Sequence, residues 1–577
     1  MKPVSLAFAA SLSISIMTHG ASAAEADLIL HHGKVITLDP RSTVAEALSV
    51  SDGRILRVGK NDDVLAARGP KTVSIDLEGK TAIPGFIDSH VHATGACLTE
   101  FDHEIPAMES IGDVLDYIRG RARALPAGSW IHVRQVFITR LRETRYPTRA
   151  ELDEAAPRHP VLFSTGPDAS LNTLALKESG IDRDFKITDG GAGTIERDSE
   201  TGEPTGILRN ATRFVKVKAS ERSASDTERL ARLESLLRDY NSVGITAVID
   251  RNASEKDMEL YGKLLEAGKL TVRVAASRSV DSLGPIEKVQ DAIRGIARDP
   301  KRPSGPHLKT IGIKMFLDGG MLTGSAYMRE PWGVSKIYSI ADPAYRGLLF
   351  IPKERLLSIV RTAAEEGLQF TAHAVGDGAV HTLLDVYEEV SRTFPLRATR
   401  PCITHSNFMS AEAVALAARL GACVDIQPAW LYLDAPTLLK QFGSERLRWF
   451  QPLRSLFRAG VVAGGGSDHM QKIGSLRSVN PYDPFLGMWT AITRKSRGRG
   501  EPLHEAESLS REEALRFYTT NNAHLHFSEK EIGSLEEGKL ADIAVLDKDI
   551  LACPVDEIRR IRVLRTFVGG REVYSAR

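Results

Sequence analysis

The amino-acid sequence predicts an α/β protein: a (β/α)8 TIM-type barrel with an inserted subdomain and a small β-sandwich. Eight short apolar segments alternate with amphipathic stretches through the middle of the chain, as in a parallel barrel. The first of these segments ends at residue 92 and the second begins at residue 244, far more than a βα loop needs. Both chain ends are rich in short strand-like runs.

The N-terminal segment, residues 1–23, has the pattern of a secretory signal peptide. Lys2 is followed by the apolar run "VSLAFAASLSISIM", and the segment ends in Ala21-Ser22-Ala23. A basic start, a short apolar core and an A-x-A ending are typical of such signals. The run is too short to span a bilayer. We therefore expect a protein exported to the periplasm or released, without a membrane partner after the signal is removed.

The two ends of the remaining chain, residues 24–83 and 530–577, are expected to form one composite β-domain. Asp52 and Gly53 lie between two apolar runs, which indicates a hairpin. The C-terminal runs "GKLADIAVLD" and "VLRTFVGGREVYS" are similar in character. Because chain termini often lie close together, the two sets of strands are expected to meet.

Residues 84–529 are expected to form the barrel, and 96–225 the inserted subdomain. Amphipathic runs such as "KERLLSIVRTAAEEG" precede several of the strand candidates. The insertion holds the strand-like runs "WIHVRQVF" and "PVLFSTG", and we place it over the barrel mouth. The eight strand candidates are "AIPGFIDSHVH", "GITAVID", "TVRVAAS", "IGIKMFLDG", "LQFTAHAVGD", "PCITHS", "ACVDIQPAW" and "VVAGGGSD".

The bulk composition excludes several classes of partner. Lys and Arg number 75 and Asp and Glu 74, for a formal net charge of +1, so nothing indicates a nucleic-acid partner. The four cysteines show no C-x-x-C spacing, so neither a zinc ribbon nor a disulfide scaffold is indicated. The expected partner is a small-molecule substrate, and a homo-oligomer remains open.

His90 and His92 end the first strand candidate. Residues i and i+2 of a strand share one face, so both imidazoles can approach one ion near a barrel axis. An H-x-H pair alone is weak evidence for a metal site, because paired surface or core histidines are common.

Other strand ends strengthen the metal hypothesis. Five of the eight candidate strands bring a ligand-type or ionisable residue to the end where barrel enzymes build active sites. Burying these groups without a partner is costly, and a shared divalent metal, zinc by default, offsets that cost. Besides His90 and His92 on the first strand, the residues are Lys314, His373, His405 and Asp468.

These residues and several longer motifs resemble the amidohydrolase superfamily. The nearest resemblance is to amidohydrolase family 3, the YtcJ-like group that includes N-substituted formamide deformylases, and it covers essentially the whole mature chain. The motifs are "PGFIDSHVH", "ERDSETGEPTGIL", "HAVGDGAV", "NPYDPFLGMWTAITR" and "GSLEEGKLADIAVLD".

The resemblance implies one or two divalent metal ions. His90, His92 and Asp468 are implied as ligands of the more buried ion, and His373 and His405 as ligands of the second. Lys314 is implied as a carboxylated bridge between the ions. The alternative is a one-metal site beside an uncharged Lys314.

The implied reaction is hydrolysis of a non-peptide C–N bond, an amide or N-acyl bond, by metal-activated water with Asp468 as general base. The ligand set is shared by hydrolases of lactones, cyclic amides and dipeptides, so these stay as alternatives. A non-catalytic binding or regulatory protein on the same fold is a further alternative.

Aromatic residues that follow the strand ends are candidates for the substrate pocket. Trp430 and Tyr432 follow the seventh strand, and Tyr327 and Trp332 lie in the long loop after Lys314. Asp318, in the same loop, is a candidate supporting group or ligand.

Overall fold

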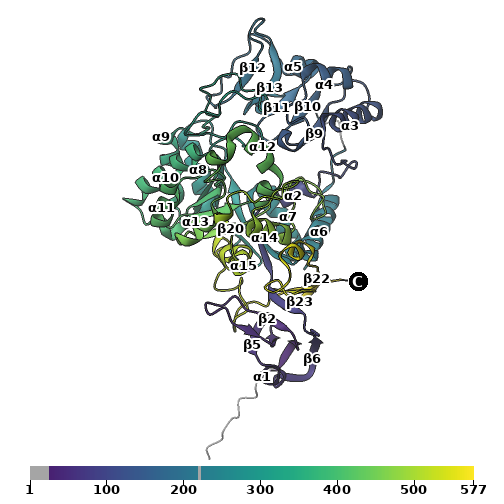
Figure 1. Cartoon of the computed structure of the whole chain (residues 1–577), viewed down its shortest axis with the longest axis vertical. Coiled ribbons are helices and arrows are strands. Elements are labelled where there is room, and N and C mark those ends of the chain that lie inside the picture. The colour runs from purple at the N-terminus through teal and green to yellow at the C-terminus, as the bar shows by residue number, and fades with distance from the viewer. Residues whose placement is uncertain (1–24, 135, 219–221, 577) are drawn as a thin grey trace, which may run out of the picture.

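The computed structural model describes residues 25–134, 136–218 and 222–576. The predicted signal peptide therefore lies outside the described residues. Figure 1 shows three parts stacked along the long axis: the inserted subdomain at the top, the barrel in the middle and the terminal strands below. Among the described residues, none of the helices combines the length and apolar character that crossing a bilayer requires.

The central sheet is the predicted barrel. Its eight strands are all parallel and follow one another in chain order. The amide of Asp468 donates to the carbonyl of His90, and the amide of His92 donates to the carbonyl of His469, both at 2.8 Å, which joins the first strand to the segment after the last. The strands are β8 (Phe86–Val91), β14 (Ile245–Ala253), β15 (Arg273–Ser279), β16 (Leu308–Phe316), β17 (Gln369–Ala374), β18 (Cys402–His405), β19 (Cys423–Ile426) and β20 (Ala463–Gly465).

Helices cover the outside of this sheet, as the alternating pattern predicts. Helix α11 (Ala411–Leu420) shows how the sequence sets its limits: the Ser410 hydroxyl accepts the amide proton of Ala413 at 3.1 Å, and Gly421 ends the helix at φ +66°. The other barrel helices are α6 (Asp226–Ser242), α7 (Glu255–Glu266), α8 (Ile286–Arg298), α9 (Lys353–Glu365), α10 (Asp377–Ser391), α12 (Pro428–Arg446), α13 (Leu453–Arg458), α14 (Pro484–Thr493), α15 (Arg511–Tyr518) and α16 (Thr520–Leu525).

The segment between β8 and β14 contains a separate five-stranded sheet in the order β12-β13-β11-β10-β9. Residues 194–209, which include the motif "ERDSETGEPTGIL", form two of these strands. The two strands pair antiparallel on either side of Gly202, which has φ +73°. The strands are β9 (Ile131–Arg134), β10 (Val161–Ser164), β11 (Ala169–Leu171), β12 (Thr194–Arg197) and β13 (Pro204–Arg209), and α3 (Ile111–Ala124), α4 (Arg149–Ala155) and α5 (Thr173–Ser179) pack beside them.

Two more sheets lie at the opposite end of the molecule (Figure 1). One is N-terminal only, in the order β5-β4-β1-β6, and Asp52 and Gly53 form its predicted hairpin turn, both at positive φ. Its strands are β1 (Ala26–His31), β4 (Ala47–Ser51), β5 (Arg54–Gly59) and β6 (Arg68–Asp76).

The second terminal sheet combines both chain ends in the order β23-β22-β21-β7-β2-β3. Strand β7 pairs antiparallel with β21, and one apolar cluster, which includes Leu28, Leu48, Ile543 and Phe567, is shared by the two sheets. The strands are β2 (Lys34–Ile36), β3 (Val44–Ala45), β7 (Thr81–Pro84), β21 (Ile543–Leu546), β22 (Val563–Val568) and β23 (Arg571–Ser575).

Candidate active site

A cavity of about 980 Å³ lies where the carboxyl ends of the barrel strands meet the inserted subdomain. All eight barrel strands contribute, either with their ends or with the segments that follow them, and the insertion contributes residues of β9, β10 and neighbouring loops. All six sequence-predicted metal ligands line this cavity: His90, His92, Lys314, His373, His405 and Asp468.

Three of these side chains converge on one point. The Nε2 atoms of His90 and His92 are 3.3 Å apart, and Asp468 Oδ1 lies 3.4 Å from the first and 3.2 Å from the second. His90 and Asp468 are buried, whereas His92 is partly open to the cavity. The β8 strand thus places its two histidines as the i, i+2 spacing predicts.

A buried carboxylate that the sequence analysis did not select fixes the orientation of His90. Asp425, on β19, accepts a hydrogen bond from His90 Nδ1 at 3.2 Å, so Nε2 keeps its lone pair for the cavity. The other carboxylate oxygen lies 3.3 Å from Nε of the buried Arg251. A lone Asp in the apolar run "ACVDIQ" was the available signal.

His405 and His373 lie side by side, with ring centroids 4.5 Å apart. Gln427 Oε1 lies 2.7 Å from His405 Nδ1, and the Gly319 carbonyl lies 3.3 Å from His373 Nε2. Each carbonyl oxygen accepts the proton of the facing nitrogen, which leaves the other ring nitrogen of each histidine with a lone pair. Burial lowers the pKa of His373 to about 3, so the ring is neutral at physiological pH.

Lys314 ends in the same cavity from β16 and is buried. Burial lowers the pKa of its amine to about 8. The uncharged amine, which an ordinary lysine scarcely populates at neutral pH, is therefore within reach here, although the protonated form still predominates.

Two site residues adopt backbone conformations that side chains disfavour. His405 has φ +78° and Asp468 has φ +54°, both in the left-handed region. Each such residue costs on the order of 1–3 kcal/mol, and such strain concentrates at functional sites. The chain therefore holds these side chains in place at a cost to stability.

Only one of the four predicted pocket aromatics lines the cavity. Trp430 stacks on His405 with ring centroids 4.8 Å apart. Trp332 packs into an apolar cluster and donates its indole N–H to the Ala326 carbonyl at 2.8 Å. Tyr432 faces a separate cavity beside Trp489, and Tyr327 packs against the barrel core.

The side chain of Asp318 supports a loop. Its carboxylate accepts the amide protons of Tyr327, Val375 and Gly376, each at 2.9 Å, and Oδ1 lies 3.9 Å from His373 Nε2. These bonds tie the long loop after β16, which holds Tyr327, to the segment that follows β17.

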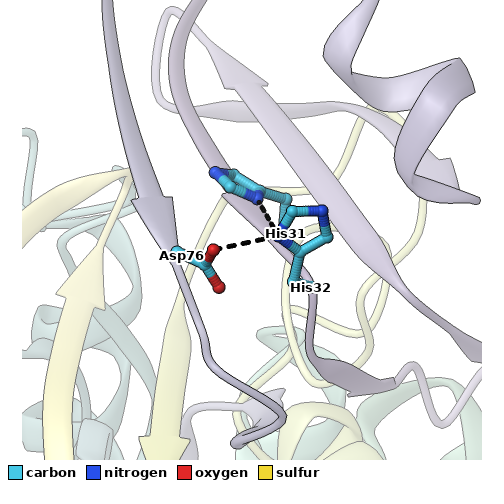
Figure 2. Close-up of side chains that lie close together, drawn as sticks. All are labelled: His31, His32 and Asp76. Carbon is cyan, nitrogen blue, oxygen red and sulfur yellow. Dashed lines mark hydrogen bonds and ion pairs between the residues drawn. The ribbon is translucent and has the colours of Figure 1, made fainter.

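A further cluster of metal-ligand type lies on the terminal sheet. Figure 2 shows His31, His32 and Asp76 pointing toward one another, with His32 Nδ1 3.1 Å from His31 Nδ1 and 2.9 Å from Asp76 Oδ2. Adjacent residues of a regular strand point to opposite faces. The left-handed backbone of His32, at φ +53°, breaks this alternation, and the rings of His31 and His32 lie next to each other. Unlike the cavity cluster, this one is largely exposed.

The amidohydrolase family matches the chain over residues 74–574. An N-substituted formamide deformylase of Arthrobacter pascens is 32% identical over 557 residues, 94% of this chain and 97% of the relative. The YtcJ protein of Bacillus subtilis is 28% identical and covers 95% of this chain and 99% of its own length. The crystal structure of a metal-dependent hydrolase from Pyrococcus horikoshii has a TM-score of 0.66 at 22% identity, over 92% of this chain and 99% of its own.

Fold and site thus define a barrel hydrolase that acts on carbon–nitrogen bonds other than peptide bonds. The chain belongs to the amidohydrolase family, which confirms the resemblance drawn from its motifs.

Proposed function

We propose that this protein holds one or two divalent metal ions, zinc by default, and hydrolyses an amide or N-acyl bond of a small molecule. The observation that best supports this proposal is the mutual spacing of three donor atoms. His90 Nε2, His92 Nε2 and Asp468 Oδ1 are separated by 3.2 to 3.4 Å.

The donor set fits a tetrahedral zinc site. Zinc binds imidazole nitrogen and carboxylate oxygen at about 2.0–2.2 Å, which separates tetrahedral donors by roughly 3.3–3.6 Å. The three donors are already close to that spacing. A hydrogen bond from His90 to Asp425 is also the usual outer support of a metal-ligating histidine.

We propose that His405 and His373 hold the second ion, since each has one ring nitrogen without a hydrogen-bond partner among the described residues. Lys314 lies in the same cavity, and its uncharged amine can react with carbon dioxide to form a carbamate. In our proposal, Lys314 carries this carbamate, which would be a ligand shared by the two ions.

The residues of this chain divide the work of hydrolysis. A bound divalent ion polarises the scissile carbonyl and makes water easier to deprotonate. Asp468 accepts the water proton on its carboxylate and passes it to the leaving nitrogen. Asn480 Nδ2 lies 3.3 Å from Asp468 Oδ2 and 2.8 Å from the Asp468 carbonyl oxygen, so it holds the base in place.

The proposed substrate class follows the named relative, an N-substituted formamide deformylase. An N-acyl amine fits a cavity that offers both apolar walls and polar groups. Lactones, cyclic amides and dipeptides are the competing substrates. We also propose export through the N-terminal signal, to the periplasm or beyond the cell.

Elemental analysis of the purified mature protein, combined with an acyl-amide activity panel, tests the proposal. We expect one to two divalent ions per chain, loss of hydrolysis on chelation and recovery on adding zinc. His32→Ala removes the exposed cluster and serves as the control, because it should leave activity and the tightly bound metal unchanged. A metal-free protein whose hydrolysis resists chelators would refute the mechanism.

A further inference from the structure

We infer that the inserted subdomain forms an anion-binding subsite over the cavity, built from His132, Arg134 and Ser164. The substrate accordingly carries a carboxylate several bonds away from its scissile amide, as an N-acyl ω-amino acid does. This inference rests on the proposed function.

Strand β9 turns two polar side chains toward the cavity. Ile131 and Val133 are buried in an apolar cluster, while His132 and Arg134 alternate with them and line the cavity. Strand β10 runs parallel beside β9 and pairs Ser164 with Arg134. Ser164 lines the cavity too, so three polar side chains share one wall.

Arg134 is a cation without a counter-ion. Among the described residues, its guanidinium has no hydrogen bond or ion pair, while its main-chain carbonyl accepts from the Gln471 side chain at 2.8 Å. The other two arginines that line the cavity have protein partners: Arg213 pairs with Asp189 at 2.6 Å, and Nε of Arg229 donates to the neutral Ala224 carbonyl at 3.1 Å.

Besides Asp468, three carboxylates line the cavity, and each accepts a hydrogen bond from a protein group. Asp250 accepts from Tyr261 at 2.8 Å, Asp257 from the Ser254 hydroxyl at 2.6 Å, and Asp281 from the Leu283 amide at 2.9 Å. None of the three is within ion-pair distance of Arg134 in the described part of the chain. The guanidinium is thus left for a ligand.

His132 adds a neutral polar group beside this cation. Its Nε2 atom is buried and has no hydrogen-bond partner among the described residues. Burial, assisted by Arg134, lowers the pKa of His132 to about 3, so the ring stays uncharged. A buried polar atom without a partner is costly, and a ligand that hydrogen-bonds to it removes the cost.

The chemistry of the wall favours a carboxylate. An arginine fork matches the two oxygens of a carboxylate, and one free cation balances one negative charge. A phosphate ester would bring a second charge that the wall does not neutralise. Because the wall belongs to the insertion while the candidate ligands belong to the barrel, the carboxylate lies away from the reacting amide.

Paired substrates test the inference: N-acyl ω-amino acids and the same compounds with a neutral carboxamide in place of the carboxylate. We expect the wild-type protein to favour the carboxylate form in kcat/KM. Arg134→Met should lower kcat/KM for that form about 10- to 100-fold, the range expected for a charged hydrogen bond, and lower it for the neutral form by a clearly smaller factor. For the carboxylate substrate, kcat/KM of Arg134→Lys should lie between the values for wild type and Arg134→Met.

Arg229→Met is the matched control, because it removes a cavity-lining guanidinium that already has a protein partner. It should change both substrates equally. Equal rates on the paired substrates, or an equal loss on both in Arg134→Met, would overturn the subsite. If neither compound is hydrolysed by zinc-loaded protein, the proposed function fails instead. Calorimetric binding of each compound to wild type and Arg134→Met then decides the subsite without turnover: equal binding of both compounds rejects it.

Discussion

Asp425 Oδ1 lies 3.2 Å from His90 Nδ1, and both side chains are buried. The two residues come from β19 and β8, far apart in the chain, and Arg251 lies on the other side of the carboxylate at 3.3 Å. The contact sets which nitrogen of His90 faces the cavity. Asp425 is therefore a positioning residue for the candidate metal centre.

Asp425→Asn should weaken metal binding about 10- to 100-fold, the usual effect of losing a carboxylate behind a ligating histidine. Competition with a chelator of known affinity measures the change. Asp434→Asn is the control, since it also breaks a buried pair, with Arg140 at 2.9 Å, but touches no candidate ligand. Equal metal affinity in the two variants would remove Asp425 from this role.

Asp468→Asn should lose about 100- to 10,000-fold in kcat, because a positioned proton acceptor contributes that much. The amide oxygen can still serve as a ligand, so most of the metal should remain. His90→Ala should instead lose metal together with activity. Near-normal turnover in Asp468→Asn would show that another group moves the proton, and His373 and His405 would be tested next.

Trp430→Phe should lower kcat/KM about 2- to 10-fold, because Trp430 lines the cavity and its indole N–H, which has no protein partner among the described residues, is left for the substrate. The Tm should fall only by the cost of the smaller ring. The stacking on His405 is kept. Trp332→Phe also removes the bond to the Ala326 carbonyl, so the Tm should fall further, while kcat/KM should stay unchanged because Trp332 does not line the cavity. Thermal melts and steady-state kinetics on both variants separate the two roles.

Asp542→Asn should lower the free energy of unfolding by about 3–5 kcal/mol, because it leaves the buried Arg273 unpaired. Asp542 accepts from Arg273 at 2.7 and 2.9 Å and joins the barrel to the terminal sheet. Glu572→Gln, which breaks a half-exposed pair with Arg565 in that sheet, should cost less than about 1 kcal/mol. Denaturant titration compares them, and similar losses would contradict the argument.

The barrel was predictable because its eight strands and their helices differ in apolar period. The gathering of the six candidate ligands in one cavity was predictable because they lie at strand ends. Asp425 was missed because a single carboxylate in an apolar run has no spacing to mark it. Arg134 and His132 lie in an insertion whose placement depends on contacts remote in the chain. The loop aromatics Tyr327 and Trp332 failed as cavity predictions because sequence position does not show which way a loop side chain turns.

The pairing of β7 with β21 has a consequence for how the chain is made. Strand β7 leaves the ribosome before the whole barrel, and its partner follows only after the barrel is complete. Until then one edge of β7 is open, and open strand edges pair with other chains. Chains interrupted anywhere within the barrel should therefore aggregate or be degraded, so that only full-length synthesis yields folded protein.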